Sequence, residues 1–159
     1  MRFAIANDHA GLPLKLPIAA ALRALGHEVT DLGVFTAEPS DYPDAARAVA
    51  RALASGVAER GVLLCGSGVG VSVAASKFPG IRAASCSDTF SARQGVEDDD
   101  MNVICIGSRV VGPLLAIEIV RAFAGATFSG QERHRRRLEK INAIEREYAG
   151  KSEATHDNS

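Results

Sequence analysis

The chain has 159 residues and a formal net charge of -1, and its 47% hydrophobic and 23% charged residues are close to the soluble globular average. A chain of this length is expected to form one compact domain that buries roughly 68–70% of its unfolded surface without a disulfide or metal. This composition excludes disorder over most of the chain. The balanced charge, the 5% of aromatic residues and the absence of Trp argue against a nucleic-acid partner. No apolar run approaches the roughly 18 residues that a membrane span needs.

The cysteines indicate a reducing compartment. Cys65, Cys86 and Cys105 cannot all pair, and each lies in an apolar run without the spacing of a metal site. The amino terminus lacks the long apolar segment of a secretory signal. We therefore expect a cytoplasmic protein that needs no metal and no other cofactor.

Short β-like runs alternate with helical patterns along the chain. The expected strands are 2–6, 28–32, 61–65, 81–86 and 103–106. The expected helices are 13–25, 44–54, 71–77, one that begins at 88, 112–123 and 131–148. In the first helix, Gly26 is the expected stop, and the candidate core residues are Leu14, Leu16, Ile18, Leu22 and Leu25.

Uninterrupted apolar strands separated by helices predict a parallel sheet that is covered on both faces. The fold class is thus α/β, a three-layer α/β/α sandwich with five strands, right-handed crossovers and an additional C-terminal helix. We expect one domain over residues 1–149 and a disordered polar tail over 150–159. Ligands of such sheets bind beyond the carboxyl ends of the strands, so the residues that directly follow each strand are the candidates for a site.

A glycine-rich loop follows the third strand. Its residues Gly66, Ser67, Gly68, Val69 and Gly70 place three alternating glycines before a helix, a pattern whose backbone N–H groups suit an oxyanion or a phosphate. The loop is not a dinucleotide-binding fingerprint, because Val71 stands where the third glycine of that motif belongs. It is not a P-loop either, because no Gly-Lys-Ser/Thr follows. The alternative is a tight turn that only requires small residues.

Two further strand ends carry reactive side chains. Cys65 precedes the glycine loop, where a helix N-terminus lowers a thiol pKa, so it is either a base or nucleophile or an inert buried cysteine. Asp8 and His9 follow the first strand and suit sugar hydroxyls, a phosphate or acid–base work. The alternative for this pair is an ordinary polar turn.

Charged residues cluster in two places. Arg133 and Arg137 are four positions apart and share a helix face, so together they can grip a phosphate, although a solvated basic stretch has the same pattern. The acidic run 97–100 can hold a cation in principle, but nothing in the sequence specifies one. We expect this run to be a solvated loop before the fifth strand.

Taken together, these residues resemble the ribose 5-phosphate isomerase B / galactose 6-phosphate isomerase family of sugar-phosphate isomerases. The resemblance covers about residues 1–148, and its segments are NDHAG at 7–11, SDYPD at 40–44, LLCGSGVGVSVAASKFPGIRA at 63–83, SDTFSAR at 87–93, MNVICIGSRVVG at 101–112 and RHRRRLEKINAIE at 133–145. It implies a Rossmann-like strand arrangement and a homodimer, possibly paired into a tetramer, with each site between two subunits.

The resemblance also implies an aldose–ketose isomerisation through an enediolate, with a phosphorylated sugar as substrate. Cys65 would be the base, because this chain has Val71 where another branch of the family has a Glu. The residues implied to bind substrate are Asp8, His9, Gly66, Ser67, Gly68, Val69, Gly70, Asp99, Arg109, Arg133 and Arg137.

One position departs from the family pattern. Family members place His-Asn before the fifth strand, and that His opens the furanose ring, whereas this chain has Asp98 and Asp99 there. Asp98 is therefore the candidate ring opener, and ribose 5-phosphate is the first expected substrate. A tetrose 4-phosphate, which cannot close that ring, is the alternative. A non-catalytic phosphosugar-binding subunit is a further alternative from another class.

Overall fold

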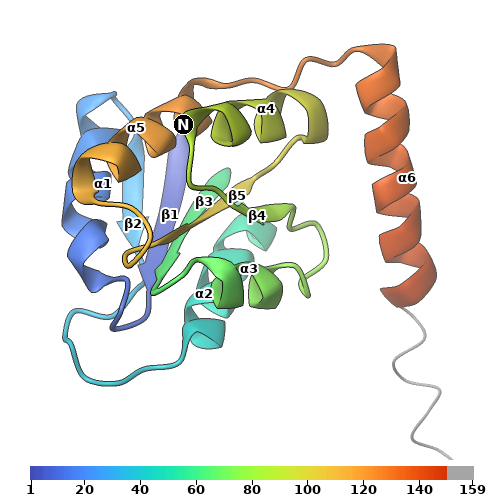
Figure 1. Ribbon diagram of the computed structural model, residues 1–159. Helices are drawn as coiled ribbons and strands as arrows, with labels where there is room; N and C mark the ends of the chain where they lie inside the picture. The colour runs from blue at the N-terminus through green and yellow to red at the C-terminus, as the bar shows by residue number, and fades with distance from the viewer. Residues whose placement is uncertain (150–159) are drawn as a thin grey trace, which may run out of the picture.

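The computed structural model describes residues 1–149, and it has the three expected layers (Figure 1). A parallel sheet with the strand order β2-β1-β3-β5-β4 forms the middle layer of the described part. The strands are β1 (Arg2–Asn7), β2 (Glu28–Asp31), β3 (Arg60–Cys65), β4 (Ala83–Ser85) and β5 (Val103–Gly107). The helices are α1 (Leu12–Ala24), α2 (Tyr42–Ala54), α3 (Val69–Ala75), α4 (Thr89–Asp99), α5 (Pro113–Gly125) and α6 (Glu132–Ala149). The predicted tail at 150–159 lies outside the described residues.

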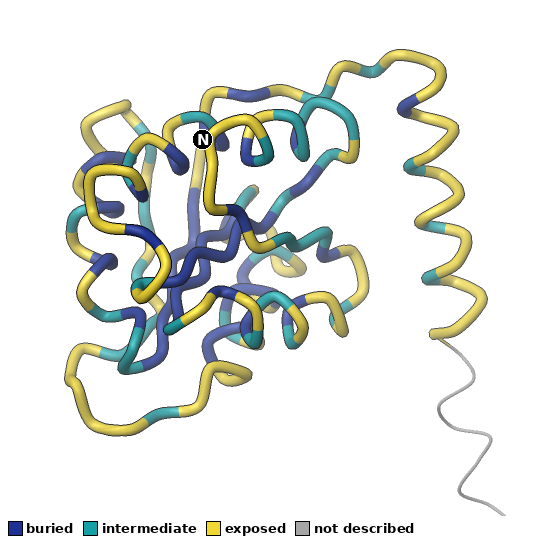
Figure 2. The backbone as a smooth tube through the Cα atoms, viewed as in Figure 1, coloured by how far each residue is buried: buried dark blue, intermediate teal, exposed yellow. Residues whose placement is uncertain are grey.

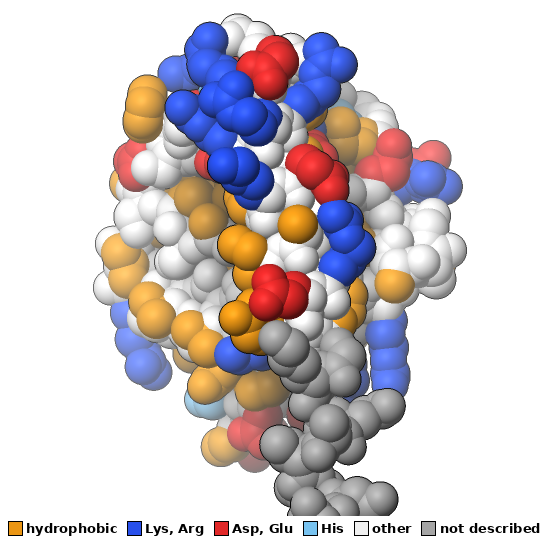
Figure 3. Space-filling model, turned by 90° about the vertical axis from the view of Figure 1, so that its right-hand side faces the viewer, with side chains coloured by type: hydrophobic (Ala, Val, Ile, Leu, Met, Phe, Trp, Pro, Cys, Tyr) orange, Lys and Arg blue, Asp and Glu red, His pale blue; other side chains and the backbone are white. Residues whose placement is uncertain are grey.

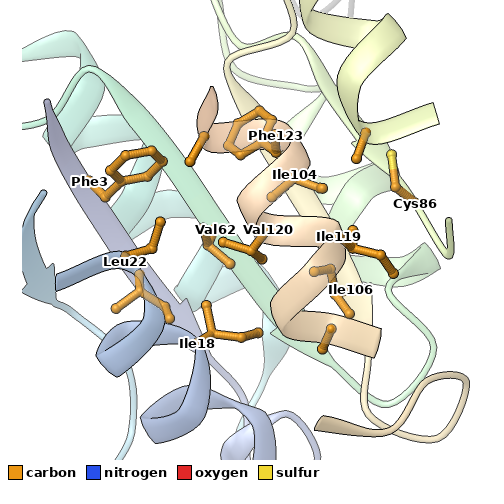
Figure 4. Close-up of a cluster of buried hydrophobic side chains, with 14 of the residues drawn as sticks. Phe3, Ile18, Leu22, Val62, Cys86, Ile104, Ile106, Ile119, Val120 and Phe123 are labelled. Carbon is orange, nitrogen blue, oxygen red and sulfur yellow. The ribbon is translucent and has the colours of Figure 1, made fainter. Parts of the chain in front are cut away.

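The two faces of the sheet carry cores of different bulk, because successive residues of a strand point to opposite sides. Phe3 and Ile5 of β1 pack with the large side chains of α1 and α5 on one face (Figure 4). Ala4 and Ala6 pack on the other face against α2 and α3, whose buried residues are mostly alanine. The central strands are buried on both faces, which explains their unbroken apolar sequence.

Two leucines predicted to lie in the core are exposed, and the prediction was wrong for them. The buried stripe of α1 contains Leu14, Ile18 and Leu22, which are spaced four residues apart. Leu16 is 72% exposed because it projects from the opposite side of the helix. Leu25 follows the last turn and is 48% exposed, and Gly26 ends the helix with a φ of 84° as expected.

The acidic run 97–100 is helical rather than a loop, which corrects the sequence prediction. The last turn of α4 includes residues 97–99, and Asp100 ends the helix in a left-handed conformation. Two side-chain pairs four residues apart offset the crowding of carboxylates. Arg93 binds Glu97 at 2.7 Å, and the Gln94 amide donates to Asp98 at 2.6 Å.

Helix α6 stands apart from the sandwich, and most of its surface is exposed (Figures 1 and 2). Its Glu145 carboxylate accepts the N–H of Gly80 at 3.0 Å, and an apolar groove of about 450 Å³ runs beneath Ile141 and Ile144. Throughout the described chain, no helix is both long enough and apolar enough to cross a membrane.

Candidate active site

A pocket of about 310 Å³ opens at the carboxyl ends of β1, β3 and β5. This is the edge of the sheet where ligands of parallel α/β folds bind. Residues from four segments of the chain line it: Asp8, His9, Ala10, Tyr42, Cys65, Gly66, Ser67, Gly70, Arg109 and Val110. The geometry thus brings the thiol, the glycine loop, the Asp-His pair and one arginine into one cavity.

The sulfur of Cys65 lies at the base of the glycine loop. The N–H of Gly68 donates to Cys65 Sγ at 3.1 Å and so directs a positive dipole at that atom. Gly68 adopts a φ of 78°, and a Cβ at this position would lie 2.8 Å from Ser85 Oγ. Only glycine fits there, and the turn that it makes is what aims the donor at the sulfur.

Two backbone N–H groups of the loop already donate hydrogen bonds within the segment 65–69. Besides the Gly68 contact to sulfur, the N–H of Val69 donates to Ser67 Oγ at 3.2 Å. The expectation that the loop presents its backbone N–H groups to a ligand therefore does not hold for Gly68 and Val69 in this conformation.

Cys86 and Cys105 lie outside the pocket. Among the three cysteines, all within the described chain, Cys65 alone lines the pocket. Burial, with a smaller contribution from the charge of Asp88, raises the pKa of Cys86 to about 11. Burial in β5 also raises the pKa of Cys105. Both cysteines pack in the cores, as the inert alternative for them predicts.

Asp8 and His9 follow β1 directly and are held by backbone contacts. Asp8 is 6% exposed, and its Oδ1 accepts the N–H of Gly11 at 2.9 Å. His9 Nδ1 lies 3.1 Å from the N–H of Ser40 and 3.2 Å from the Ser40 carbonyl oxygen. Both contacts are made by Nδ1, so together they set the orientation of the ring in the pocket.

The segment that orients His9 is anchored from behind by a buried lysine. Lys15 of α1 is 1% exposed, and its Nζ lies 3.1 Å from Asp31 Oδ2 and donates to the Val34 carbonyl. The same ammonium lies 3.8 Å from the centre of the Phe35 ring. These contacts hold the start of the connection between β2 and α2, which carries Ser40.

Two more side chains complete the rim of the pocket. The Arg109 backbone N–H donates to the Gly66 carbonyl at 2.9 Å, and its guanidinium lies over that glycine. Tyr42 begins α2, and its ring packs so closely on Gly70 that a Cβ there would lie 2.8 Å from Cζ. Tyr42 was missed as a site residue, although it stands within the SDYPD segment.

The remaining predicted residues lie elsewhere. Helix α4 runs back from the carboxyl edge of the sheet, so Asp98 and Asp99 lie near its amino edge, before β5. The five residues of β5 span about 16 Å at ~3.3 Å per residue, and the Cys65 end of β3 pairs with the far end of that strand. Arg133 and Arg137 are exposed on the first turns of α6, where basic side chains gather (Figure 3).

One chain therefore divides the predicted site into two groups. The pocket group contains Asp8, His9, Cys65, Gly66, Ser67, Gly70 and Arg109, whereas Gly68 and Val69 of the same loop do not line the pocket. The α4–α6 group contains Asp98, Asp99, Arg133 and Arg137, none of which lines that pocket.

Asp98 is held by neighbours that the sequence did not single out. The side-chain amide of Gln94 donates to Asp98 Oδ2 at 2.6 Å. The Nε2 of His134 lies 3.4 Å from Asp98 Oδ1, and its Nδ1 lies 2.6 Å from Ser129 Oγ. Over the described residues, no three His, Cys, Asp or Glu side chains are grouped so that they could hold a metal ion.

Comparison with known proteins connects this geometry to a family. Residues 3–141 match the family described as Ribose/Galactose Isomerase. Ribose-5-phosphate isomerase B of Escherichia coli is 48% identical over 144 residues, which cover 91% of this chain and 96% of that protein. D-erythrulose-4-phosphate isomerase of Pectobacterium atrosepticum is 43% identical, over 82% of this chain and 86% of its own.

A solved structure agrees with the sequence relatives. The structure of ribose-5-phosphate isomerase B from Clostridium thermocellum superposes with a TM-score of 0.90 at 45% identity, and covers 93% of this chain and 99% of its own. The fold and the relatives together define a sugar-phosphate isomerase. Specifically, the chain belongs to the ribose/galactose isomerase family.

Proposed function

We propose that the protein interconverts D-ribose 5-phosphate and D-ribulose 5-phosphate, with Cys65 as the base. The observation that carries the proposal is the position of Cys65: its sulfur has a backbone donor at 3.1 Å in a pocket rimmed by Asp8, His9 and Arg109. A thiolate is a competent proton acceptor when it is desolvated and faces a positive dipole. Relatives named for this reaction support the choice of substrate.

The pocket group carries the isomerisation. Cys65 takes the proton from C2 of the open aldose, and the electron pair moves into an enediolate whose charge lies on O1. The hydroxyl proton of O2 then passes to O1, and the thiol returns its proton, or one exchanged with solvent, to C1 as the C2 carbonyl forms. Negative charge develops on the C1 and C2 oxygens, where the Ser67 hydroxyl and the free donors of the loop stabilise it. The buried Asp8 carboxylate accepts hydrogen bonds from sugar hydroxyls.

Residues of both groups bind the phosphate of the substrate. His9, whose ring is oriented by Ser40, donates to the phosphate from Nε2, and Arg109 adds a guanidinium at the pocket rim. Arg133 and Arg137 supply the remaining positive charge, but the length of β5 separates their end of the fold from Cys65 in one chain. A second copy must therefore bring its α4–α6 group to the pocket, so the active form is a homodimer with two shared sites.

The substrate is tested by proton NMR of the wild-type protein with ribose 5-phosphate in D₂O. We expect ribulose 5-phosphate to appear with deuterium at the carbon that receives the proton, and conversion by the Cys65→Ala variant to be slower by about 10²–10⁴-fold. Conversion by Cys65→Ala at the wild-type rate would exclude the thiol as the base.

The shared site is tested by mixing two impaired variants and assaying at a substrate concentration far below the wild-type KM. Cys65→Ala damages one group and Arg133→Ala the other, so random exchange of subunits should restore about a quarter of the wild-type activity in a dimer. Mixtures that stay inactive after unfolding and joint refolding would contradict a site built from two copies.

A tetrulose 4-phosphate is the second candidate substrate. The observation in its favour is the carboxylate pair Asp98-Asp99 at the position where the family resemblance implies His-Asn, and one relative is named for D-erythrulose 4-phosphate. The phosphate of such a sugar occupies the hydroxyl that would close a furanose, so no ring opening is needed. The ratio of kcat/KM for erythrulose 4-phosphate and ribose 5-phosphate decides between them.

All three cysteines are free thiols, which fits the cytoplasmic location that we also propose.

A further inference from the structure

Helix α6 contributes a buried imidazole to the α4–α6 group. Of the residues of α6, all of them described, His134 alone is buried, with 4% of its surface exposed. Its ring lies between Asp98 of α4 and Ser129 of the preceding connection, 3.4 Å from the carboxylate and 2.6 Å from the hydroxyl. An imidazole buried between an acid and a hydroxyl is arranged to hold or pass a proton rather than to fill space.

The surrounding contacts allow a proton between the ring and Asp98. Ser129 Oγ accepts the N–H of Gln131 at 3.3 Å and can donate its own hydrogen to His134 Nδ1. In that arrangement the proton of a neutral ring lies on Nε2, facing the Asp98 carboxylate. Gln94 donates to the other carboxylate oxygen at 2.6 Å, so the orientation of Asp98 is set from both sides.

The pair remains accessible from one side only. The side chain of Asp98 is 32% exposed while that of His134 is 5% exposed, so a ligand would meet the carboxylate first and the imidazole behind it. Arg133 and Arg137, on the exposed surface of the same helix, are the residues proposed to hold the phosphate. A proton donor therefore lies beside the proposed phosphate grip.

We propose that Asp98 and His134 act as one acid–base unit that opens the furanose ring of the substrate, with His134 as the positioning residue and proton partner of Asp98. The inference rests on the proposed function. In the step, the unit gives a proton to the ring oxygen as the bond from C1 to that oxygen breaks and its electron pair goes to the oxygen. The C1 hydroxyl releases its proton as the C1 carbonyl forms, and that proton returns to the unit.

In this arrangement Asp98 and His134 together open the ring, a role that the family resemblance assigns to a single His. An ionised carboxylate can only accept hydrogen bonds, and one oxygen of Asp98 already accepts from Gln94. The imidazole next to it supplies the exchangeable proton that a lone carboxylate lacks. The substitution at position 98 is thereby compatible with a ring-forming pentose.

The test separates ring opening from isomerisation by using both directions of the reaction. Ribulose 5-phosphate has no hydroxyl in position to close a furanose, so exchange of its C1 hydrogen with D₂O depends on Cys65 but not on ring opening. The variant is His134→Gln, whose side-chain amide keeps a donor near the Nε2 position but cannot carry a transferable proton. The matched control is His27→Gln, because His27 lies beside Phe3, outside both groups.

We expect His134→Gln to slow the turnover of ribose 5-phosphate by about 10²-fold, the usual size of an acid–base contribution. The C1 exchange of ribulose 5-phosphate should stay within a few-fold of the wild-type rate, and that exchange also shows that the variant folds. Equal loss in both assays, or no loss in either, would overturn the proposal. Should the glutamine variant give no folded protein, Asp98→Asn and Ser129→Ala are put through the same two assays, with the same selective loss expected and equal loss overturning it. A wild-type protein inactive on both sugars would instead contradict the proposed function itself.

Discussion

The pocket group and the α4–α6 group are built in different ways. The pocket group stands on strand ends and uses backbone donors, and Cys65 and Asp8 are 3% and 6% exposed. The α4–α6 group consists of side chains on helix surfaces, and both of its arginines are exposed. This difference fits the proposed roles: proton transfer at the reacting carbons requires fixed geometry, which the strand ends provide, whereas long arginine side chains can adapt to a phosphate.

The largest expected effect is a loss of kcat on mutation of the pocket group. Replacing Cys65 with Ala removes the proposed base, and kcat for ribose 5-phosphate should fall by about 10²–10⁴-fold with little change in KM. Steady-state kinetics measure both constants. Cys86→Ala is the matched control, since that thiol packs in the core away from the pocket, and it should keep kcat within a few-fold. Parallel losses in the two variants would point to a general folding defect instead.

The two arginines of the α4–α6 group should affect substrate binding rather than kcat. Arg137→Ala removes a charge-assisted contact to phosphate worth roughly 1.5–3 kcal/mol, so KM should rise by about 10–100-fold. Arg135→Ala removes the same charge from the same helix at a position proposed to make no phosphate contact. An equal rise of KM in the two variants would mean that α6 attracts the phosphate only by its overall charge.

The support behind the pocket can be tested through stability. Lys15→Met keeps the size of the side chain but leaves the Asp31 carboxylate and the Val34 carbonyl without their buried partner. Unfolding free energy should fall by about 1–3 kcal/mol, with Tm lowered by roughly 2–4 °C for each kcal/mol. Lys77→Met, at an exposed lysine, is the control for loss of charge and should leave the thermal midpoint nearly unchanged.

The smallest expected effect is an alkaline one at Cys86. Burial raises the pKa of this thiol from 9.0 to about 11 in the folded protein, so the unfolded chain loses the proton first as the pH rises. The stability linked to this group is complete below pH 9 and is lost as the pH passes through 11. Chemical denaturation between pH 8 and pH 10.5 should therefore show a shallower decline for Cys86→Ala than for the wild type. Identical slopes would contradict the raised pKa.

Elements whose sequence reflects their own burial or backbone geometry could be predicted from the sequence. The central strands were found because burial on both faces makes them uniformly apolar, and the glycine loop was found because its backbone needs small residues. β4 is shorter than predicted because Arg82, just before it, bonds through its N–H to the Asn102 side chain rather than to a strand. Leu16 was misplaced because leucine is apolar on either side of a helix.

The missed site residues share a different cause. Tyr42 reaches the pocket only because α2 begins against the glycine loop, a contact between segments far apart in the chain. His134 was hidden among arginines, and only the packing of α6 on α4 brings it to Asp98. Sequence patterns report the local backbone and its burial, whereas these two positions depend on how helices meet.

The five residues of β5 have a consequence for how such enzymes can diverge. One strand length separates the pocket group from the α4–α6 group, so in the proposed dimer each copy of the chain would supply different halves to two different sites. After a gene duplication, one copy can lose its thiol and the other its arginines, and the pair still assembles one working site. The freed surfaces are then open to mutation toward a new sugar, without a stage at which all activity is lost.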